Sequence, residues 1–295
     1  MAEQATGRAR TAAGMAKGVA LGFLAYALFT FGDANVKALS GRLSVFEIGF
    51  FVGVFALAML PFIRRPGEPW REAFRPKRPG LVAVRVASGI CAGLLGMVAF
   101  TNLPFAEAYA IIFLAPSFVT ILSALILKER VAWQRLAAIA LGFGGVLLVV
   151  RPGFQELHPA HLAALGTALA MAATVLVLRV IAPVESRVTL LAYPILTGKL
   201  VTGPLMLLDF RWPEPIEFGF LALAGLLAAA AQIGLIQATR FAPAHRVGPA
   251  QYSQIVWAVV IGAVFFAEIP DGVALAGIGL VLASGLFAFL GRAAA

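Results

Sequence analysis

The chain has little of what enzymes in water use for chemistry. Its 295 residues include one cysteine, three histidines and only 13% charged residues. A single cysteine, Cys91, excludes an internal disulfide framework and a cluster of thiolate metal ligands. Neither a glycine-rich phosphate loop nor a Gly-x-Ser-x-Gly nucleophile motif occurs in the sequence. We therefore do not expect an enzyme, and we expect no cofactor.

The three histidines do not form a convincing metal site. His158 and His161 follow Glu156 in a Glu-x-His-x-x-His run, which resembles one part of a zinc motif. The run lies in a predicted external loop and lacks a second pair of ligands. His245 lies between the eighth and ninth predicted helices, without an obvious serine partner. We expect no bound metal.

Long hydrophobic runs, by contrast, fill most of the chain. Hydrophobic residues make up 61% of it, and runs of about 17 to 25 residues follow one another from residue 15 to residue 290. A helix of that length crosses about 30 Å of hydrocarbon. Strands of a membrane barrel would be shorter and would alternate in polarity, so we predict helices. The predicted fold is all-α, with ten membrane helices at residues 15–39, 45–63, 81–100, 106–127, 131–150, 160–181, 188–208, 218–239, 247–266 and 273–290.

Positive charges gather on one side of the predicted helices. The formal net charge is +9, but the basic residues lie between apolar runs and not along one polar face, which argues against a nucleic-acid partner. If alternate loops lie on alternate sides, seventeen lysines and arginines fall on the side of the N-terminus and three on the other. By the positive-inside rule, we expect both termini in the cytoplasm and the protein in the cell inner membrane.

The second half of the chain resembles the first. Residues 103–145 match residues 241–285 at a constant offset of 139, which aligns Glu129 with Glu268. Each of these glutamates ends one apolar run just before the next begins. Five helices per half is an odd number, so the second copy must enter the membrane in the opposite direction. The predicted organisation is a cytoplasmic tail at 1–14, a first repeat at 15–150, an external linker at 151–159, a second repeat at 160–290 and a cytoplasmic end at 291–295.

Several short motifs are typical of one known family. They are Pro104-Phe105-Ala106-Glu107-Ala108, Pro116, Lys128-Glu129-Arg130, the glycines Gly142, Gly144 and Gly145, and their second-half counterparts ending at Glu268. With these motifs the chain resembles the drug/metabolite transporter superfamily of the EamA type. This resemblance implies ten helices arranged as two inverted five-helix repeats, and a transport function.

One segment indicates a particular branch of this family. Residues 31–61, with Ser44-Val45-Phe46-Glu47, are similar to S-adenosylmethionine and riboflavin uptake carriers. Such carriers commonly have an arginine one turn after the position of Glu47, where this chain has Val52. The departure concerns the substrate and not the fold.

Few ionisable residues lie inside the predicted helices of the first half. A charge at this depth costs about 2.5 kcal/mol or more, so each is a candidate functional residue. Asp33 and Lys37 are four residues apart on one helix face, where they could pair; alternatively the helix ends sooner, or Lys37 reaches the surface and takes Asp33 with it. Glu47 and Glu107 each open a helix, either as coupling groups or as helix caps. The candidates for coupling are Asp33, Glu47 and Glu107, and those for substrate binding are Asp33, Asn102, Glu107 and Tyr109.

Amide and aromatic side chains gather in the second half. Amides orient a polar ligand in a low-dielectric cavity, and aromatic rings provide a surface for stacking. Hydrogen bonds between helices and interfacial anchoring are the alternative interpretation. Lys199 lies deep in the seventh predicted helix, and its depth indicates a partner that the sequence does not name. The substrate-binding candidates here are Gln232 and Gln237 in the eighth helix, and Gln251, Tyr252, Gln254 and Trp257 in the ninth.

Small residues and one proline predict how the helices pack. Gly89 and Gly93 are four residues apart, and other glycines inside predicted helices also let backbones approach closely: Gly142, Gly145, Gly277 and Gly279. Pro116 removes a backbone hydrogen bond in the middle of the fourth helix, which predicts a kink or a hinge.

Together these features predict a secondary carrier that moves a small organic metabolite by alternating access. Energy would come from an ion gradient, from exchange or from the gradient of the substrate itself. The resemblance favours S-adenosylmethionine or riboflavin uptake; export of amino acids or drug-like metabolites is the alternative, and an intramembrane enzyme is a third. The expected partners are the small-molecule substrate, protons or an exchanged metabolite, and the lipid bilayer, with no nucleic acid.

Overall fold

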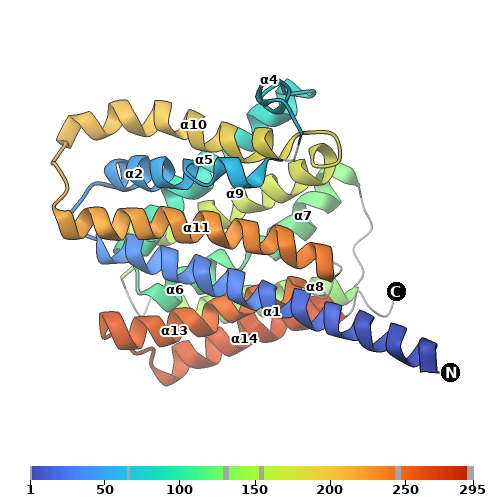
Figure 1. Cartoon of the computed structure of the whole chain (residues 1–295). Coiled ribbons are helices and arrows are strands. Elements are labelled where there is room, and N and C mark those ends of the chain that lie inside the picture. Colours follow the sequence, from blue (N-terminus) through green and yellow to red (C-terminus); the bar gives the residue numbers. More distant parts are fainter. Residues whose placement is uncertain (1, 65–66, 129–132, 153–155, 243–246, 291–295) are drawn as a thin grey trace.

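Helices account for almost all of the described chain (Figure 1). The computed structural model describes residues 2–64, 67–128, 133–152, 156–242 and 247–290. Within these residues, 8 helical segments are long and apolar enough to cross a membrane, and two shorter apolar helices complete the set. The predicted all-α polytopic fold is confirmed. The elements are α1 (Ala2–Ala38), α2 (Val45–Leu57), α3 (Leu60–Ile63), α4 (Trp70–Ala73), α5 (Pro79–Asn102), α6 (Phe105–Ile112), α7 (Ala115–Leu127), α8 (Trp133–Val150), α9 (Pro159–Ile181), α10 (Arg187–Met206), η1 (Leu207–Asp209), α11 (Pro215–Phe241), η2 (Gly248–Tyr252), α13 (Ser253–Phe266) and α14 (Gly272–Leu290).

The fourth predicted helix is two helices. α6 ends at Ile112 and α7 begins at Ala115, so Pro116 lies in the first turn of α7 and not in the middle of one helix. A proline costs little there, because the first N–H groups of a helix have no intrahelical acceptor. The hydroxyl of Thr120 donates to the carbonyl oxygen of Pro116 at 3.1 Å. The predicted kink is therefore a complete break between two short helices.

The second predicted helix also ends earlier than expected. Ser44 and Glu47 form a capping box that starts α2 at Val45, as the sequence indicates. α2 ends at Leu57, whereas the sequence predicts a helix to residue 63; Pro61 instead occupies the first turn of α3. A proline cannot continue the hydrogen-bond ladder of the preceding turn, so it favours a new start.

The packing of the helices has the symmetry expected of two repeats. α1 packs along α11, and α5 packs along α9. α2 packs on α10, and α8 packs on α14. Numbered as ten spans, the first contacts the eighth as the sixth contacts the third. The second span contacts the seventh, and the fifth contacts the tenth. If each span of one half is replaced by the equivalent span of the other half, the same set of contacts results.

The two repeats run in opposite directions. Figure 1 shows that α1 begins and α14 ends at one end of the bundle, called the near end below, and that α1 ends at the other, called the far end. At the far end Lys37 of α1 contacts Glu268. His161, in the first turn of α9, contacts Glu107. Since Glu107 and Glu268 line the same cavity, α9 begins where α1 ends, as an inverted repeat requires.

Two glycines bring α8 and α14 into backbone contact. A Cβ atom added to Gly145 would lie 2.7 Å from the carbonyl oxygen of Gly277, and one added to Gly277 would lie 2.6 Å from that of Gly145. This confirms the prediction of close packing for both. Gly93 and Gly279 differ, because nothing lies within 4 Å of a Cβ atom added to either, and Gly93 borders a cavity.

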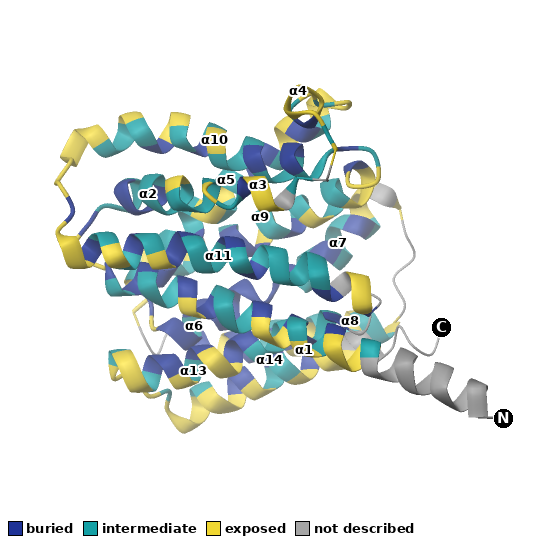
Figure 2. Ribbon diagram, in the orientation of Figure 1, coloured by how far each residue is buried: buried dark blue, intermediate teal, exposed yellow. Residues whose placement is uncertain are grey.

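The outer surface of the bundle is apolar. Large side chains such as Leu162, Leu200 and Val264 are largely exposed, and Figure 2 shows exposed residues along the outer helices as well as at the ends. Exposed apolar area of this extent is unfavourable in water but is the normal surface of a helix bundle in lipid.

Candidate functional site

An ion pair between a buried lysine and a partly buried glutamate joins the two repeats at the far end. Lys37 is 8% exposed, and its Nζ lies 2.8 Å from Oε1 of Glu268, which follows α13. The same Nζ donates to the carbonyl oxygen of Leu103 at 2.7 Å. Oε2 of Glu268 accepts from the main-chain N–H of Phe105 at 2.7 Å. The pairing of Lys37 with Asp33 that the sequence allows is therefore wrong. The sequence does not predict this role of Glu268; the signal it contains is the alignment of Glu268 with Glu129 in the repeats.

Asp33 belongs to a separate network. The hydroxyl of Tyr109, on α6, donates to Oδ2 of Asp33 at 2.5 Å. Nε2 of Gln254, on α13, lies 3.5 Å from the Tyr109 oxygen, which makes a weak hydrogen bond. Tyr109 and Gln254 are 3% and 9% exposed. Three predicted candidates from both repeats thus meet at one place, although their role in binding stays a prediction.

Glu107 lies apart from this network. Its Oε1 lies 2.8 Å from Nε2 of His161 in α9, and both side chains are nearly buried. His158 caps the start of α9 and is not in a free loop, since its ring accepts from the N–H of Ala160. Asn102 is exposed at the end of α5, where its amide donates to the carbonyl oxygen of Val98 at 2.8 Å. The structure does not bring Asn102 and Glu107 to Tyr109 as one site.

Glu47 serves the start of α2. Its carboxylate accepts from the main-chain N–H groups of Ser44 at 2.8 Å and Arg211 at 2.9 Å. Arg211 also donates to Glu217 at 2.6 Å. These bonds agree with the capping interpretation. A coupling role for Glu47 stays a prediction.

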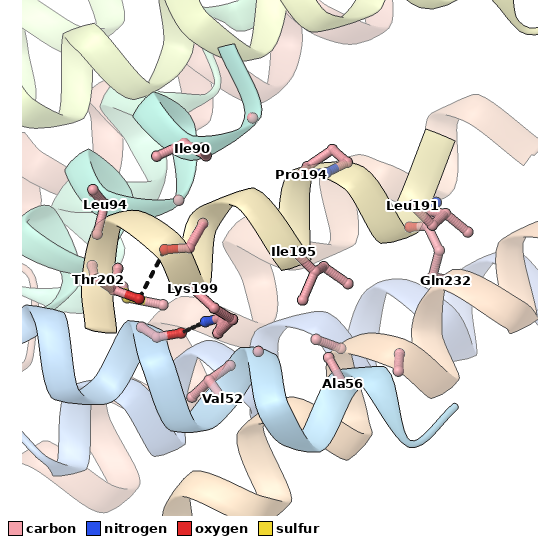
Figure 3. Close-up of a pocket in the computed structure, with 18 of the residues that line it drawn as sticks. Val52, Ala56, Ile90, Leu94, Leu191, Pro194, Ile195, Lys199, Thr202 and Gln232 are labelled. Atoms are coloured by element: carbon pink, nitrogen blue, oxygen red, sulfur yellow. Dashed lines mark hydrogen bonds between the residues drawn. The ribbon is translucent and has the colours of Figure 1, made fainter. Parts of the chain in front are cut away.

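One cavity lies between helices of the two repeats and is called the central cavity below (Figure 3). It has a volume of about 310 Å³ and is lined mainly by α2 and α5 of the first half and α10 and α11 of the second. Its lining is mostly apolar, with Lys199, Thr202 and Gln232 as polar exceptions. Thr202 donates to the carbonyl oxygen of Gly198 on its own helix at 2.9 Å. Of the predicted candidates, Gln232 lies in this cavity, whereas Gln237 accepts from Arg240 at 3.3 Å near the end of α11.

The candidates that open the ninth helix are divided among three places. Gln251 and Tyr252 lie in the 3₁₀ helix η2 and line another cavity of about 360 Å³, together with Arg135 and Arg179. Gln254 reaches the Asp33 network. Trp257 is 36% exposed, with its ring 6.2 Å from that of Phe31 on α1. The predicted cluster is therefore not one site.

Comparisons with known proteins agree with the architecture. The EamA-like transporter family matches residues 16–151 and 158–290. A solved crystal structure is similar over 93% of this chain and 97% of its own, with a TM-score of 0.64 and 18% identity, which supports the fold alone.

Curated relatives are transporters with different substrates. The chain is 25% identical to an S-adenosylmethionine uptake transporter of Rickettsia prowazekii over 86% of both chains. It is 30% identical to a riboflavin transporter of Rhizobium johnstonii over 80% of this chain and 77% of that protein. It is 27% identical to a pseudopaline exporter of Pseudomonas aeruginosa, over 88% and 91% respectively.

Proposed function

Because the chain belongs to the EamA-like transporter family, we propose that it is a secondary carrier that moves a small organic metabolite across the cell inner membrane by alternating access. The observation that carries the proposal is a central cavity lined by helices of both halves. A cavity of this size accommodates a small organic molecule. Rocking of one repeat against the other would expose it to each side in turn.

The ion pair of Lys37 and Glu268 supplies a device for this movement. It connects α1 of the first repeat to the end of α13 in the second, at 2.8 Å. In this state the contact holds the repeats together at the far end. Opening the far end would require the pair to separate, so the pair acts as a gate whose strength sets the balance between two states.

The orientation follows from the loops. We propose that the near end, with both termini, faces the cytoplasm and that the repeats are residues 15–150 and 160–290. Seventeen lysines and arginines on the near-end side support this proposal. The far-end gate would then close the external side.

Among the carboxylates proposed for coupling, Asp33 is the best placed. Glu107 has His161 as a partner, and Glu47 accepts from two main-chain N–H groups. Asp33 accepts from the hydroxyl of Tyr109 and has no ion pair within the described residues. A carboxylate without a cation at membrane depth is suited to bind and release a proton.

For the substrate we propose uptake of S-adenosylmethionine or riboflavin, in line with two of the relatives. Export of an amino acid or a drug-like metabolite is the second candidate, and the likeness to the pseudopaline exporter favours it. The near relatives thus differ in both substrate and direction.

Uptake by proteoliposomes tests the function. Purified full-length protein is reconstituted and exposed to labelled S-adenosylmethionine, riboflavin and a panel of amino acids, each with and without an imposed pH gradient. Saturable uptake of one compound supports the carrier, and dependence on the gradient supports proton coupling. Failure of every compound in both directions, with folded protein in the vesicles, would contradict the proposal.

A further inference from the structure

Lys199 carries its amino group into the central cavity. It lies in α10, about 10 Å along the helix axis from Met206 and about 18 Å from Arg187, so it is deep within the span. Its Nζ donates to the carbonyl oxygen of Gly49 on α2 and lies 5.6 Å from the centre of the Phe50 ring. An ammonium group has three N–H donors, and this one has a single main-chain acceptor within the described residues.

The surroundings of Lys199 are apolar. Figure 3 shows the side chain extending from α10 toward α2, near Val52 and Ile195. No aspartate or glutamate is among the described residues that line the cavity. Lys37 and Arg151 at the far end differ, because Lys37 pairs with Glu268 and Arg151 pairs with Asp271. Lys199 has no acidic partner in the part of the chain that the structure describes.

A second cation lies beside the same cavity. Arg85 is one turn before Gly89, which lines the cavity, and a Cβ atom added to Gly89 would lie 2.5 Å from Nη1 of Arg85. The Nε atom of Arg85 is buried and has no hydrogen-bond partner within the described residues. Two basic side chains without a carboxylate thus flank one apolar space.

We propose that the central cavity binds organic acids, with the carboxylate on Nζ of Lys199 and the apolar body among the side chains that line the cavity. An unbalanced positive charge in a low-dielectric cavity is costly, and the carboxylate of a ligand balances it. Arg85, nearer the cytoplasmic end, attracts the same charge. This inference rests on the proposed function, in which the central cavity is the transport site.

The absence of a side chain at Gly53 leaves room for the amino group of Lys199. A Cβ atom at Gly53 would overlap Nζ and Cε of Lys199. Because these atoms are the far end of a flexible side chain, Gly53→Ala would move the amino group away without removing its charge or disturbing the backbone. This variant separates the position of the charge from its presence.

Three compounds with one apolar body test the proposal: phenylpropanoate, phenylpropanamide and phenylpropylamine. Their affinities for the purified full-length protein are measured by thermal shift and by titration. We expect the wild type to bind the acid about tenfold or more tightly than the amide, and the amine least. Lys199→Met and Gly53→Ala should lose this preference, whereas Lys199→Arg should keep most of it. Lys17→Met, which removes an exposed lysine outside the cavity, is the control and should resemble the wild type.

The outcomes separate this proposal from the general function. Equal binding of acid and amide, absence of acid binding by folded wild type, or unchanged acid binding in Lys199→Met would each overturn it. Binding of the acid without uptake in proteoliposomes would leave the site in place and remove the carrier function. Uptake of a neutral compound that is undiminished in Lys199→Met would support the carrier function and contradict the proposed site for organic acids.

Discussion

At the far end of the bundle Lys37 lies 2.8 Å from Glu268, whereas Lys199 in the central cavity has no carboxylate partner within the described residues. Both are lysines in membrane helices, and both donate to a main-chain carbonyl oxygen. The difference lies in what completes the charge balance. The protein supplies the anion at the far end and leaves the central position to a ligand.

The two lysines therefore have different roles: Lys37 stabilises the contact between the repeats, and Lys199 binds a ligand. A buried pair with additional hydrogen bonds loses much of its stability when one member is removed, because the other charge stays without compensation. A buried cation without a partner already bears that cost, and it gains when an anion arrives. Substitutions at the far end should therefore act first on stability, and substitutions in the cavity on binding and transport.

The largest effect is expected from Lys37→Met. The change leaves Glu268 with the N–H of Phe105 as its remaining described donor. We expect a loss of about 3 kcal/mol in the free energy of unfolding, because Lys37 is buried and Glu268 is partly buried, and a loss of uptake. The unfolding temperature of the purified protein and proteoliposome uptake measure the two effects.

Glu268→Gln is the control for that experiment. The amide keeps an oxygen for the Phe105 N–H but leaves Lys37, the more buried partner, without a counter-charge, so we expect a loss of similar size. The double variant should lose less than the sum of the two single variants, since both remove the same interaction. Strict additivity would show that the two side chains do not stabilise each other.

Asp33→Asn should have the next largest effect, on transport and not on folding. We expect uptake to fall about tenfold or more at an unchanged level in the membrane, and to lose its response to a pH gradient. Tyr109→Phe, which removes the hydroxyl donor and keeps the carboxylate, should retain the response. Full activity of Asp33→Asn would exclude Asp33 as the coupling group.

The fold was accessible from the sequence for physical reasons. A bilayer demands spans of about 20 apolar residues, so the number of helices follows from the lengths of the runs. The offset of 139 between Glu129 and Glu268 made the repeat visible. Glu129 itself lies outside the described residues. Helix ends were less accessible, because Pro61 and Pro116 start new helices where a continuous one was expected.

The site was less accessible, because partners depend on how each helix is rotated. Asp33 and Lys37 share a helix face by spacing, yet one contacts α6 and the other Glu268. Tyr252 and Gln254 are likewise two residues apart, yet Tyr252 lines one cavity and Gln254 contacts Tyr109. The depth of Lys199 was visible in the sequence, but the lack of an acid near it becomes visible only in three dimensions.

Gly93→Leu tests whether a change in the central cavity affects transport without affecting stability. Gly93 lines the central cavity, and nothing lies within 4 Å of an added Cβ, so a larger side chain enters the cavity without displacing the backbone. We expect a several-fold loss of uptake with an unchanged unfolding temperature. Gly279→Leu is the matched control, because Gly279 also has nothing within 4 Å but does not border this cavity. Equal losses in both variants would show that the effect is not specific to the cavity.

The smallest effect on stability is expected for the ion pair of Arg151 and Asp271, which lies at the far end and is open to solvent. Nη2 of Arg151 lies 2.5 Å from Oδ1 of Asp271, but Asp271 is 56% exposed, so water and salt screen the attraction. Hydrogen bonding to Arg151 holds the pKa of Asp271 below its ordinary value. Such a carboxylate contributes stability above its unfolded pKa of about 4, and the contribution is lost as the pH falls through the lower folded value. Arg151→Gln should thus lower the unfolding temperature slightly at neutral pH and low salt. The difference from the wild type should disappear in acid and shrink at high salt. A loss of stability as large as that of Lys37→Met, independent of salt, would mean that the pair of Arg151 and Asp271 is not screened by solvent.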